Sequence, residues 1–263
     1  MMERPLLTAR LTTKRCLCAR TQTYHLEFNL PEVEQFDFTP GQFISIVAER
    51  TRPDGQVKQD TRAYSLASAP RANSFDLCVN RIDAAAHEPE LGQEPGQTSG
   101  AGYFSNLLCD LKTGDAIELH GPHGNFVLRQ PLTDSILIAS HTGIAPIRAM
   151  LQHALASDVS ASEVMEGGRI FLVQEVPGQA ETLYAPEFEE LQRAAATAFR
   201  YRPIRDEGEG HARLLECVGA LLAKEPEIRT AYICGLNAMV APVRAALKEL
   251  GWDRKQIVFE RYD

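Results

Sequence analysis

Long apolar runs are absent from this sequence of 263 residues. Because no stretch approaches the roughly 18 uninterrupted apolar residues of a membrane-spanning helix, a membrane span is excluded. The chain also begins without the apolar segment of a secretory signal, so we expect a cytoplasmic protein. Basic residues are outnumbered, with 27 lysines and arginines against 35 aspartates and glutamates, which gives a net charge of −8. Nucleic acid is therefore not the expected main partner.

Cysteine patterns typical of metal sites are missing as well. The six cysteines are widely spaced, and the one close pair, Cys16 and Cys18, is a C-x-C within an expected strand. Zinc sites usually contain two C-x-x-C pairs, and plant-type iron–sulfur sites contain a C-x4-C-x2-C run. The sequence therefore predicts reduced thiols, no disulfide framework and no bound metal, so that any iron–sulfur chemistry lies on another protein.

The first half of the chain is rich in short β-type segments separated by turn residues, a spacing that favours a small antiparallel β-barrel. The expected strands are 8–18, 22–29, 42–49, 62–67, 75–82, 116–120 and 125–128, with one short helix at 103–110. Residues 83–100 carry four acidic residues and no basic one. We expect this segment to be either a flap or a partly disordered loop.

The second half alternates strands with helices, which predicts a doubly wound parallel sheet with helices on both faces. Its expected strands are 135–139, 169–176, 199–204, 231–234 and 256–260, and its expected helices are 145–156, 185–195, 212–223 and 237–250. The turn-rich segment 130–134 lies between the two patterns. We therefore expect a β-barrel domain over 1–130 and an α/β domain over 131–263, whose ligands bind at the carboxyl ends of the strands.

Three short segments suit anionic and aromatic ligands. Residues 140–146 (SHTGIAP) join a buried strand to a helix, where free N–H groups hold an anion and Gly143 permits close approach. Residues 62–68 (RAYSLAS) place an arginine, a tyrosine and a serine at the end of a barrel strand. Residues 102–108 (GYFSNLL) put another glycine before a helix. Each segment alone is also compatible with an ordinary turn, strand or capped helix.

Taken in order along the chain, these segments resemble the plant-type ferredoxin–NADP reductase family. Six family motifs occur in the right order and cover nearly the whole chain. They are R-x-Y-S at 62–65, G-x-x-S-N-x-L at 102–108, G-P-x-G at 121–124, T-G-I-A-P at 142–146, C-G-L-x-x-M at 234–239 and E-x-Y at 260–262. The resemblance implies an FAD-dependent enzyme that exchanges electrons between NAD(P)H and a one-electron carrier, ferredoxin or flavodoxin.

The resemblance also implies the roles of individual residues. Tyr64 is expected on one face of the flavin and Tyr262 on the other, with Ser65 near flavin N5. Cys234 is expected beside the hydride path and Glu260 next to Ser65, so these two residues join Ser65 and Tyr262 as the expected catalytic group. The expected contacts to FAD or NAD(P) are Arg62, Ala63, Tyr64, Ser65, Val79, Gly102, Tyr103, Phe104, Ser105, Asn106, Thr142, Gly143, Ile144, Ala145, Pro146, Arg205, Arg213, Gly235, Met239 and Tyr262. Alternatively, Cys234 is one more buried apolar side chain, and Glu260 and Tyr262 belong to a frayed terminus.

Two departures from the family pattern affect the expected coenzyme site. His141 stands where the family has glycine, and is either a ligand contact, a proton-carrying group near the flavin or a surface side chain that swings aside. Asp263 adds a carboxylate after the terminal tyrosine.

A third departure concerns the 2′-phosphate of NADP. Arg205 and Arg213 are available to bind it, but Asp206, Glu207 and Glu209 lie in the same loop and would repel it. The cofactors implied are therefore FAD with either NADP or NAD.

The sequence leaves the electron partner open. Five basic residues and no acidic one lie between Arg4 and Leu26, which is either a docking face for an acidic ferredoxin or flavodoxin or a solvated strand face. The alternatives to a ferredoxin or flavodoxin reductase are the reductase component of a multi-component oxygenase or cytochrome P450 system, and a flavin subunit that no longer turns over NAD(P)H.

Overall fold

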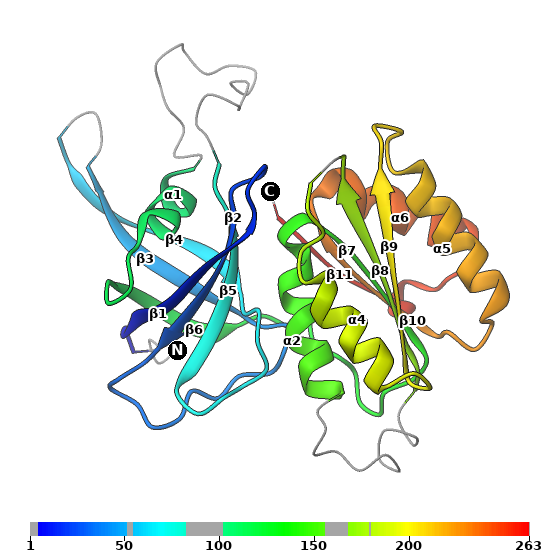
Figure 1. Ribbon diagram of the computed structural model, residues 1–263, viewed down its shortest axis with the longest axis horizontal. Coiled ribbons are helices and arrows are strands. Elements are labelled where there is room, and N and C mark those ends of the chain that lie inside the picture. The colour runs from blue at the N-terminus through cyan, green and yellow to red at the C-terminus, as the bar shows by residue number, and fades with distance from the viewer. Residues whose placement is uncertain (1–4, 52–54, 83–101, 156–167, 179, 263) are drawn as a thin grey trace.

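The chain forms two β-sheets, an antiparallel one from its first half and a parallel one from its second half (Figure 1). The computed structural model describes residues 5–51, 55–82, 102–155, 168–178 and 180–262. The acidic segment 83–100 lies outside these residues. Within the described chain, no helix is long and apolar enough to cross a membrane.

The first sheet has the strand order β4-β3-β6-β1-β2-β5, and every neighbouring pair is antiparallel. Its strands are β1 (Leu7–Cys18), β2 (Thr23–Asn29), β3 (Phe43–Thr51), β4 (Val57–Ser65), β5 (Ser74–Asn80) and β6 (Ala116–His123). Just after β4, Leu66 forms a bridge with Leu77 of β5, and the Ala67 N–H donates to the carbonyl of Asp76 at 2.8 Å. These contacts join the two edge strands at one end, so the sheet is a partly closed barrel.

The barrel core follows from the alternation of apolar side chains along the strands. Leu26 and Phe28 of β2 and Phe75 and Leu77 of β5 are all fully buried. The rings of Phe28 and Phe75 stack with centroids 5.4 Å apart. Helix α1 (Tyr103–Asp110) buries Phe104, Ser105, Leu108 and Cys109, and Phe104, Leu108 and Cys109 join the barrel core.

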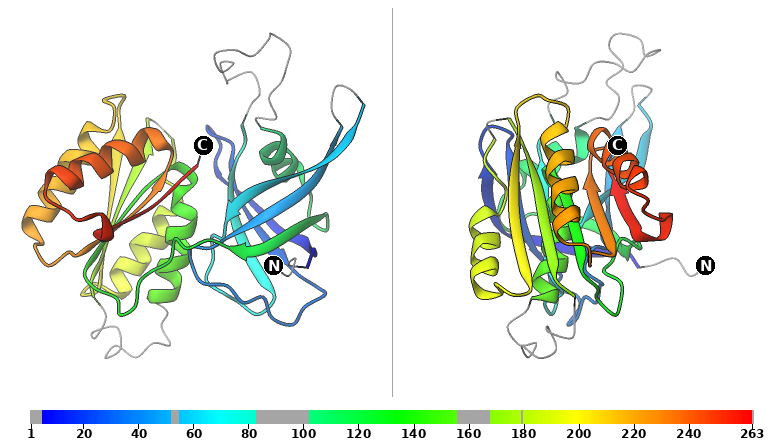
Figure 2. Two further views of the ribbon diagram at one scale, coloured as in Figure 1. Left: turned by 180° about the vertical axis from the view of Figure 1, so that it is seen from behind. Right: turned by 90° about the vertical axis from the view of Figure 1, so that its right-hand side faces the viewer.

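The second sheet has the order β11-β10-β7-β8-β9, and all its pairs are parallel. Its strands are β7 (Ser135–Ser140), β8 (Ile170–Pro177), β9 (Phe199–Asp206), β10 (Thr230–Gly235) and β11 (Ile257–Arg261). Every residue of β7 and β10 is buried. Helices therefore cover both faces (Figure 2): α2 (Ile144–Ala154) and α4 (Ala185–Ala194) on one, α5 (Ala212–Lys224) and α6 (Asn237–Glu249) on the other.

The predicted fold is confirmed, with errors in two strands. The strand expected at 125–128 does not form, because Phe126 packs against Tyr232 of the second sheet, with ring centroids 6.2 Å apart, and its backbone has no strand partner among the described residues. Strand β4 begins at Val57 and ends at Ser65, not at 62 and 67. Its early part was missed because its side chains are mostly exposed and polar, while its backbone continues the ladder with β3.

A buried ionic cluster joins the two domains. Arg148 of α2 donates through Nη1 to the carbonyl of Ala67 at 2.7 Å and to Asp76 Oδ2 at 3.1 Å, both in the barrel domain. Its Nε donates to the Glu187 carboxylate of α4 at 2.8 Å. The Asp76 side chain is 1% exposed and that of Arg148 is 9% exposed. Arg148 therefore fixes α2 against the chain that leaves strand β4.

Tyr184 extends this cluster toward the barrel. Its hydroxyl lies 3.0 Å from His25 Nδ1, and its ring lies under the Arg148 guanidinium, 4.7 Å from ring centroid to Cζ. His25 Nε2 is 3.6 Å from Asp76 Oδ2. Burial lowers the pKa of His25, although the Asp76 carboxylate opposes this effect. The contact between the domains is thus a packed, polar interface of fixed geometry.

Candidate functional site

A cavity with about 880 Å³ of open space lies between the two domains. We call it the central cavity. Nine of the predicted ligand contacts line it: Arg62, Ala63, Tyr64, Ser65, Val79, Ser105, Thr142, Ala145 and Tyr262. His141, singled out as a departure, also lines it, as do five residues that sequence reasoning missed: Cys78, Asn80, Ile82, Ser140 and Leu236.

The end of β4 supplies one wall of the central cavity. Arg62 and Tyr64 share one face of the strand because side chains alternate along it. The Arg62 side chain is exposed and makes no hydrogen bond or ion pair within the described part of the chain. Burial raises the pKa of the Tyr64 hydroxyl, so the phenol is neutral at ordinary pH. This wall therefore offers an unengaged cation beside a neutral aromatic ring.

Ser65 is the centre of a hydrogen-bond chain across the domain boundary. Its hydroxyl donates to Glu260 Oε1 at 3.0 Å and accepts a hydrogen bond from the Tyr262 hydroxyl at 2.8 Å. Burial raises the pKa of Glu260, whereas the hydrogen bond from Ser65 partly opposes this shift. Burial also raises the pKa of Tyr262 well above its ordinary value, and the nearby Cys234 and Glu260 add to the shift. The chain thus holds a carboxyl group that binds its proton more readily than usual.

The C-terminal residues are held by the parallel sheet. In the ladder between β10 and β11, Cys234 is the partner of Glu260, and the Tyr262 N–H donates to the Gly235 carbonyl at 3.0 Å. A frayed terminus is therefore excluded for Glu260 and Tyr262. Cys234 is fully buried, and burial raises the pKa of its thiol, so it remains protonated. The parallel sheet therefore brings Cys234, Glu260 and Tyr262 together, and hydrogen bonds join this group to Ser65 of β4.

The start of α1 supplies a second wall. Gly102 has φ +86°, and a Cβ there would lie 2.4 Å from the Ile82 carbonyl oxygen, so only glycine fits. The Ser105 hydroxyl donates to the Gly102 carbonyl at 3.1 Å and accepts from the Ile82 N–H at 3.3 Å. The first turn carries no acidic residue and no side-chain cap, so its electrostatics suit an anion at this helix end.

The neighbouring side chains of this helix turn away from the central cavity. Phe104 packs in the barrel core, and the Tyr103 hydroxyl donates to the Glu49 carbonyl at 2.8 Å. Asn106 Oδ1 is buried and has no hydrogen-bond partner within the described chain.

The segment 140–146 follows β7 and begins α2. A Cβ on Gly143 would lie 2.2 Å from the Cys234 carbonyl oxygen, so this glycine lets the turn pack against β10. That reason differs from the close ligand approach that the sequence suggested. Ile144 is fully buried and Pro146 is also buried, so their side chains do not reach the central cavity. The buried Ser140 hydroxyl lines the cavity and has no hydrogen-bond partner among the described residues.

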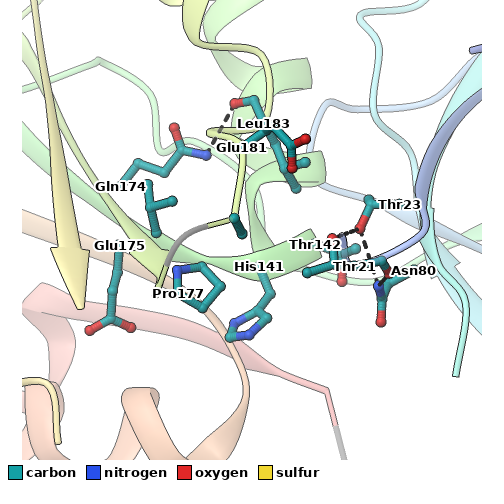
Figure 3. Close-up of a pocket in the computed structure, with 12 residues that line it drawn as sticks. Thr21, Thr23, Asn80, His141, Thr142, Gln174, Glu175, Pro177, Glu181 and Leu183 are labelled. Atoms are coloured by element: carbon teal, nitrogen blue, oxygen red, sulfur yellow. Dashed lines mark hydrogen bonds between the residues drawn. The ribbon is translucent and has the colours of Figure 1, made fainter. Parts of the chain in front are cut away.

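His141 adopts φ +50°, a left-handed conformation that favours glycine. The family glycine at this position is thereby explained by backbone geometry. The imidazole is exposed and lines both the central cavity and a neighbouring one. We call the neighbour the outer cavity; it has about 370 Å³ of open space at the ends of β7 and β8 (Figure 3).

The two arginines predicted for a 2′-phosphate are engaged by this chain's own oxygens. Arg205 donates to the carbonyls of Gly178 at 2.6 Å and Ala180 at 3.1 Å. Arg213 forms ion pairs with Glu207 at 2.9 Å and Glu209 at 3.0 Å. Neither arginine lines the central cavity, and Met239 is buried beneath Gly235.

Comparison with known proteins identifies both halves. Residues 8–128 match the family model of the oxidoreductase FAD-binding domain, and residues 137–245 match that of the oxidoreductase NAD-binding domain. The chain is 32% identical over 255 residues to ferredoxin–NADP reductase B of Sorangium cellulosum, an alignment that covers 90% of this chain and 91% of that protein.

Two further similarities extend this result. The chloroplastic root isozyme of ferredoxin–NADP reductase from Oryza sativa subsp. japonica is 31% identical over 212 residues, which is 74% of this chain and 54% of that protein. The chain thus spans about half the length of this plant relative. Ferredoxin–NADP+ reductase from Plasmodium falciparum shares the fold, with a TM-score of 0.74 and 22% identity over 98% of this chain and 96% of that one.

Proposed function

The chain belongs to the ferredoxin–NADP reductase family of FAD-dependent NAD(P)H oxidoreductases, and from this membership we propose that it exchanges electrons between NAD(P)H and ferredoxin or flavodoxin. The observation that supports this most is the hydrogen-bonded group of Ser65, Glu260 and Tyr262, which joins the two domains at the central cavity. We also propose that the domain boundary follows residue 130, so that residues 1–130 bind FAD and residues 131–263 bind the coenzyme.

The donors of the central cavity fit FAD. The Arg62 guanidinium and the N-terminal end of α1 suit its pyrophosphate, and the half-buried Tyr64 ring on the cavity wall suits its flat isoalloxazine. The buried, unpaired Ser140 hydroxyl indicates a polar ligand on the opposite wall, because buried hydroxyls are almost always hydrogen-bonded. Bound FAD supplies the chemistry, since it accepts a hydride equivalent and releases electrons one at a time.

The protein's own residues orient the reactants. Tyr64 and Ser65 position the flavin, and the T-G-I-A-P segment at 142–146 holds the coenzyme at the carboxyl end of β7. Tyr262, which lines the central cavity together with Tyr64, covers the other flavin face and moves aside when nicotinamide arrives. Cys234, small and protonated, leaves room beside it, and Glu260 holds a proton at the end of the hydrogen-bond chain through Ser65. Proximity of the two rings is the main catalytic contribution that the protein makes.

We propose that NADPH and NADH are both accepted. Arg205 and Arg213 are the side chains available for a 2′-phosphate, but Arg213 is already paired with Glu207 and Glu209. A double variant, Glu207→Ala with Glu209→Ala, frees Arg213 and should raise kcat/KM for NADPH relative to NADH by about tenfold, the effect of one charge-assisted hydrogen bond. An unchanged ratio would refute a role for Arg213 in coenzyme choice.

The basic face that this chain offers to an acidic partner is smaller than the sequence suggested. Arg4 lies outside the described residues, and Lys14 donates to the carbonyls of Cys109 and Leu111 at the end of α1. Arg10 is exposed and donates to the carbonyl of Gly114 at 3.3 Å. Arg15 and Arg20 remain exposed on and after β1, with no side-chain hydrogen bond within the described part of the chain. We propose that these two arginines steer an acidic carrier toward the barrel domain. A cytoplasmic location remains our proposal, supported by the six unpaired cysteines.

A two-stage assay tests the function. Turnover of NADPH or NADH with ferricyanide measures the flavin reaction, and carrier-dependent reduction of cytochrome c then measures delivery to ferredoxin or flavodoxin. We expect activity in both stages. Ferricyanide turnover with no carrier-dependent rate would move the protein to the reductases of multi-component oxygenases, and no turnover with either coenzyme would refute the proposal.

A further inference from the structure

Three ligand-type side chains converge at the carboxyl ends of β8 and β9, outside the central cavity. Glu175 comes from β8, Asp206 ends β9, and His211 precedes the first turn of α5. One nitrogen or oxygen atom from each lies within 4.8 Å of the other two. His211 Nδ1 is 2.7 Å from Glu175 Oε1.

Among the described residues, no lysine or arginine pairs with the carboxylates of this cluster, Glu175 and Asp206. The nearest arginines of the same loops, Arg205 and Arg213, are held by carbonyls and by other carboxylates. The Glu175 side chain is only 3% exposed, so its carboxylate has lost most of its hydration and has a histidine as its partner.

We propose that Glu175, Asp206 and His211 bind a zinc ion, with water as the fourth ligand, and that the bound ion excludes the coenzyme. An imidazole and two carboxylates form a donor set that suits zinc, whereas magnesium and calcium prefer oxygen alone. Ligand atoms of a tetrahedral zinc site are roughly 3.3 Å apart, given bonds of about 2.0–2.1 Å. Glu175 Oε1 and His211 Nδ1, only 2.7 Å apart, therefore have to separate slightly and give up the hydrogen between them to the solvent, whereas the Asp206 carboxylate has to move inward.

Competition with the coenzyme follows from the neighbours of this cluster and rests on the proposed function. His141 and Thr142, at the start of the proposed coenzyme segment, line the outer cavity together with Glu175. Figure 3 shows the His141 imidazole and the Glu175 carboxylate directed to the same side of this cavity. Ligands of doubly wound sheets bind at these strand ends, so a hydrated ion at Glu175 stands in the path of the coenzyme.

Zinc binding is measured by titration calorimetry on tag-free protein in a Cys16→Ser background, because Cys16 is the exposed cysteine of the described chain. His211→Asn and Glu175→Gln remove a ligand each, and asparagine tolerates the left-handed backbone (φ +69°) at position 211. His153→Asn, which alters an exposed histidine at the end of α2, is the matched control. Each ligand variant should bind zinc at least about 10- to 100-fold more weakly, since even outer-shell partners contribute that much.

The kinetic arm uses the holoenzyme with NADH and NADPH. Zinc, but not magnesium, should raise the KM for the coenzyme in the parent and in the control, while reduction of the flavin by dithionite stays unchanged. Equal zinc binding in the parent and both ligand variants would overturn the site, and zinc binding without a change in KM would overturn the competition. If the zinc-free enzyme reacts with neither coenzyme, the proposed function fails, and the calorimetry still decides the metal site.

Discussion

Replacing Arg148 by methionine keeps most of the aliphatic stem but removes the guanidinium that joins the two domains. The change leaves the Ala67 carbonyl unpaired and deprives the buried Asp76 carboxylate of one partner, although Arg71 still pairs with it. Loss of one member of a buried ion pair costs about 3–5 kcal/mol, and because Arg71 remains we expect about 3 kcal/mol. The corresponding fall in Tm is roughly 6–12 °C.

The matched control is Arg71→Met, which removes the other arginine from the same carboxylate. Its side chain is 48% exposed, so its loss should cost only about 1 kcal/mol. Urea unfolding followed by circular dichroism and by the fluorescence of Trp252, the one tryptophan of the chain, measures both variants. Adding Asp76→Asn to Arg148→Met should recover part of the loss. If the free energies of unfolding of the two single variants lie within about 0.5 kcal/mol of each other, the buried Arg148 guanidinium does not stabilise the domain contact as proposed.

Three further expectations follow. Because the folded state raises the pKa of Glu260, the protonated form stabilises the fold fully below about pH 4.5, and this stabilisation is lost as pH rises through the raised pKa. Glu260→Gln should therefore have a higher Tm than the parent at pH 8 and an equal Tm near pH 4. A difference in Tm that does not depend on pH would contradict this expectation. Gly143→Ala should lower the free energy of unfolding by about 2 kcal/mol or more, because the new Cβ clashes with the Cys234 carbonyl, whereas Gly219→Ala, which meets open space within α5, should raise it by about 0.5–1 kcal/mol. Denaturant unfolding compares the two variants. A change of the same sign in both would show that contact with β10 is not what requires glycine at position 143. Arg62→Ala should weaken FAD binding about 10- to 100-fold, measured as free flavin after ultrafiltration, and parent-like retention would remove Arg62 from the FAD site.

Much of the fold was predictable because the periodicity of apolar residues is a local signal. The continuous apolar run 135–139 has the composition of a strand buried on both faces, and the structure places it at the centre of the parallel sheet. Phe126 shows the limit of that signal, because its partner Tyr232 is more than 100 residues away. Val57–Thr61 shows the opposite limit, since a strand with mostly exposed side chains on both faces carries no apolar period.

The sequence motifs predicted which residues form the candidate site, but not all of the packing contacts that require those residues. The order of the motifs anticipated that Ser65 meets Glu260 and Tyr262, although nearly 200 residues separate Ser65 from these two. It did not anticipate that Gly143 is required by β10, because that contact depends on tertiary packing. Arg148 and the cluster around Glu175 and His211 carry no spacing signal, since their partners come from separate strands and helices.

Anaerobic reduction of the purified flavoprotein, followed by flavin absorbance after rapid mixing with NADPH and with NADH in parallel, tests directly whether the coenzyme reduces the bound flavin. We expect at least one coenzyme to bleach the flavin rapidly, because segment 142–146 and the Ser65–Glu260–Tyr262 group bring nicotinamide to it. A flavin that dithionite reduces but that neither coenzyme bleaches would contradict this expectation.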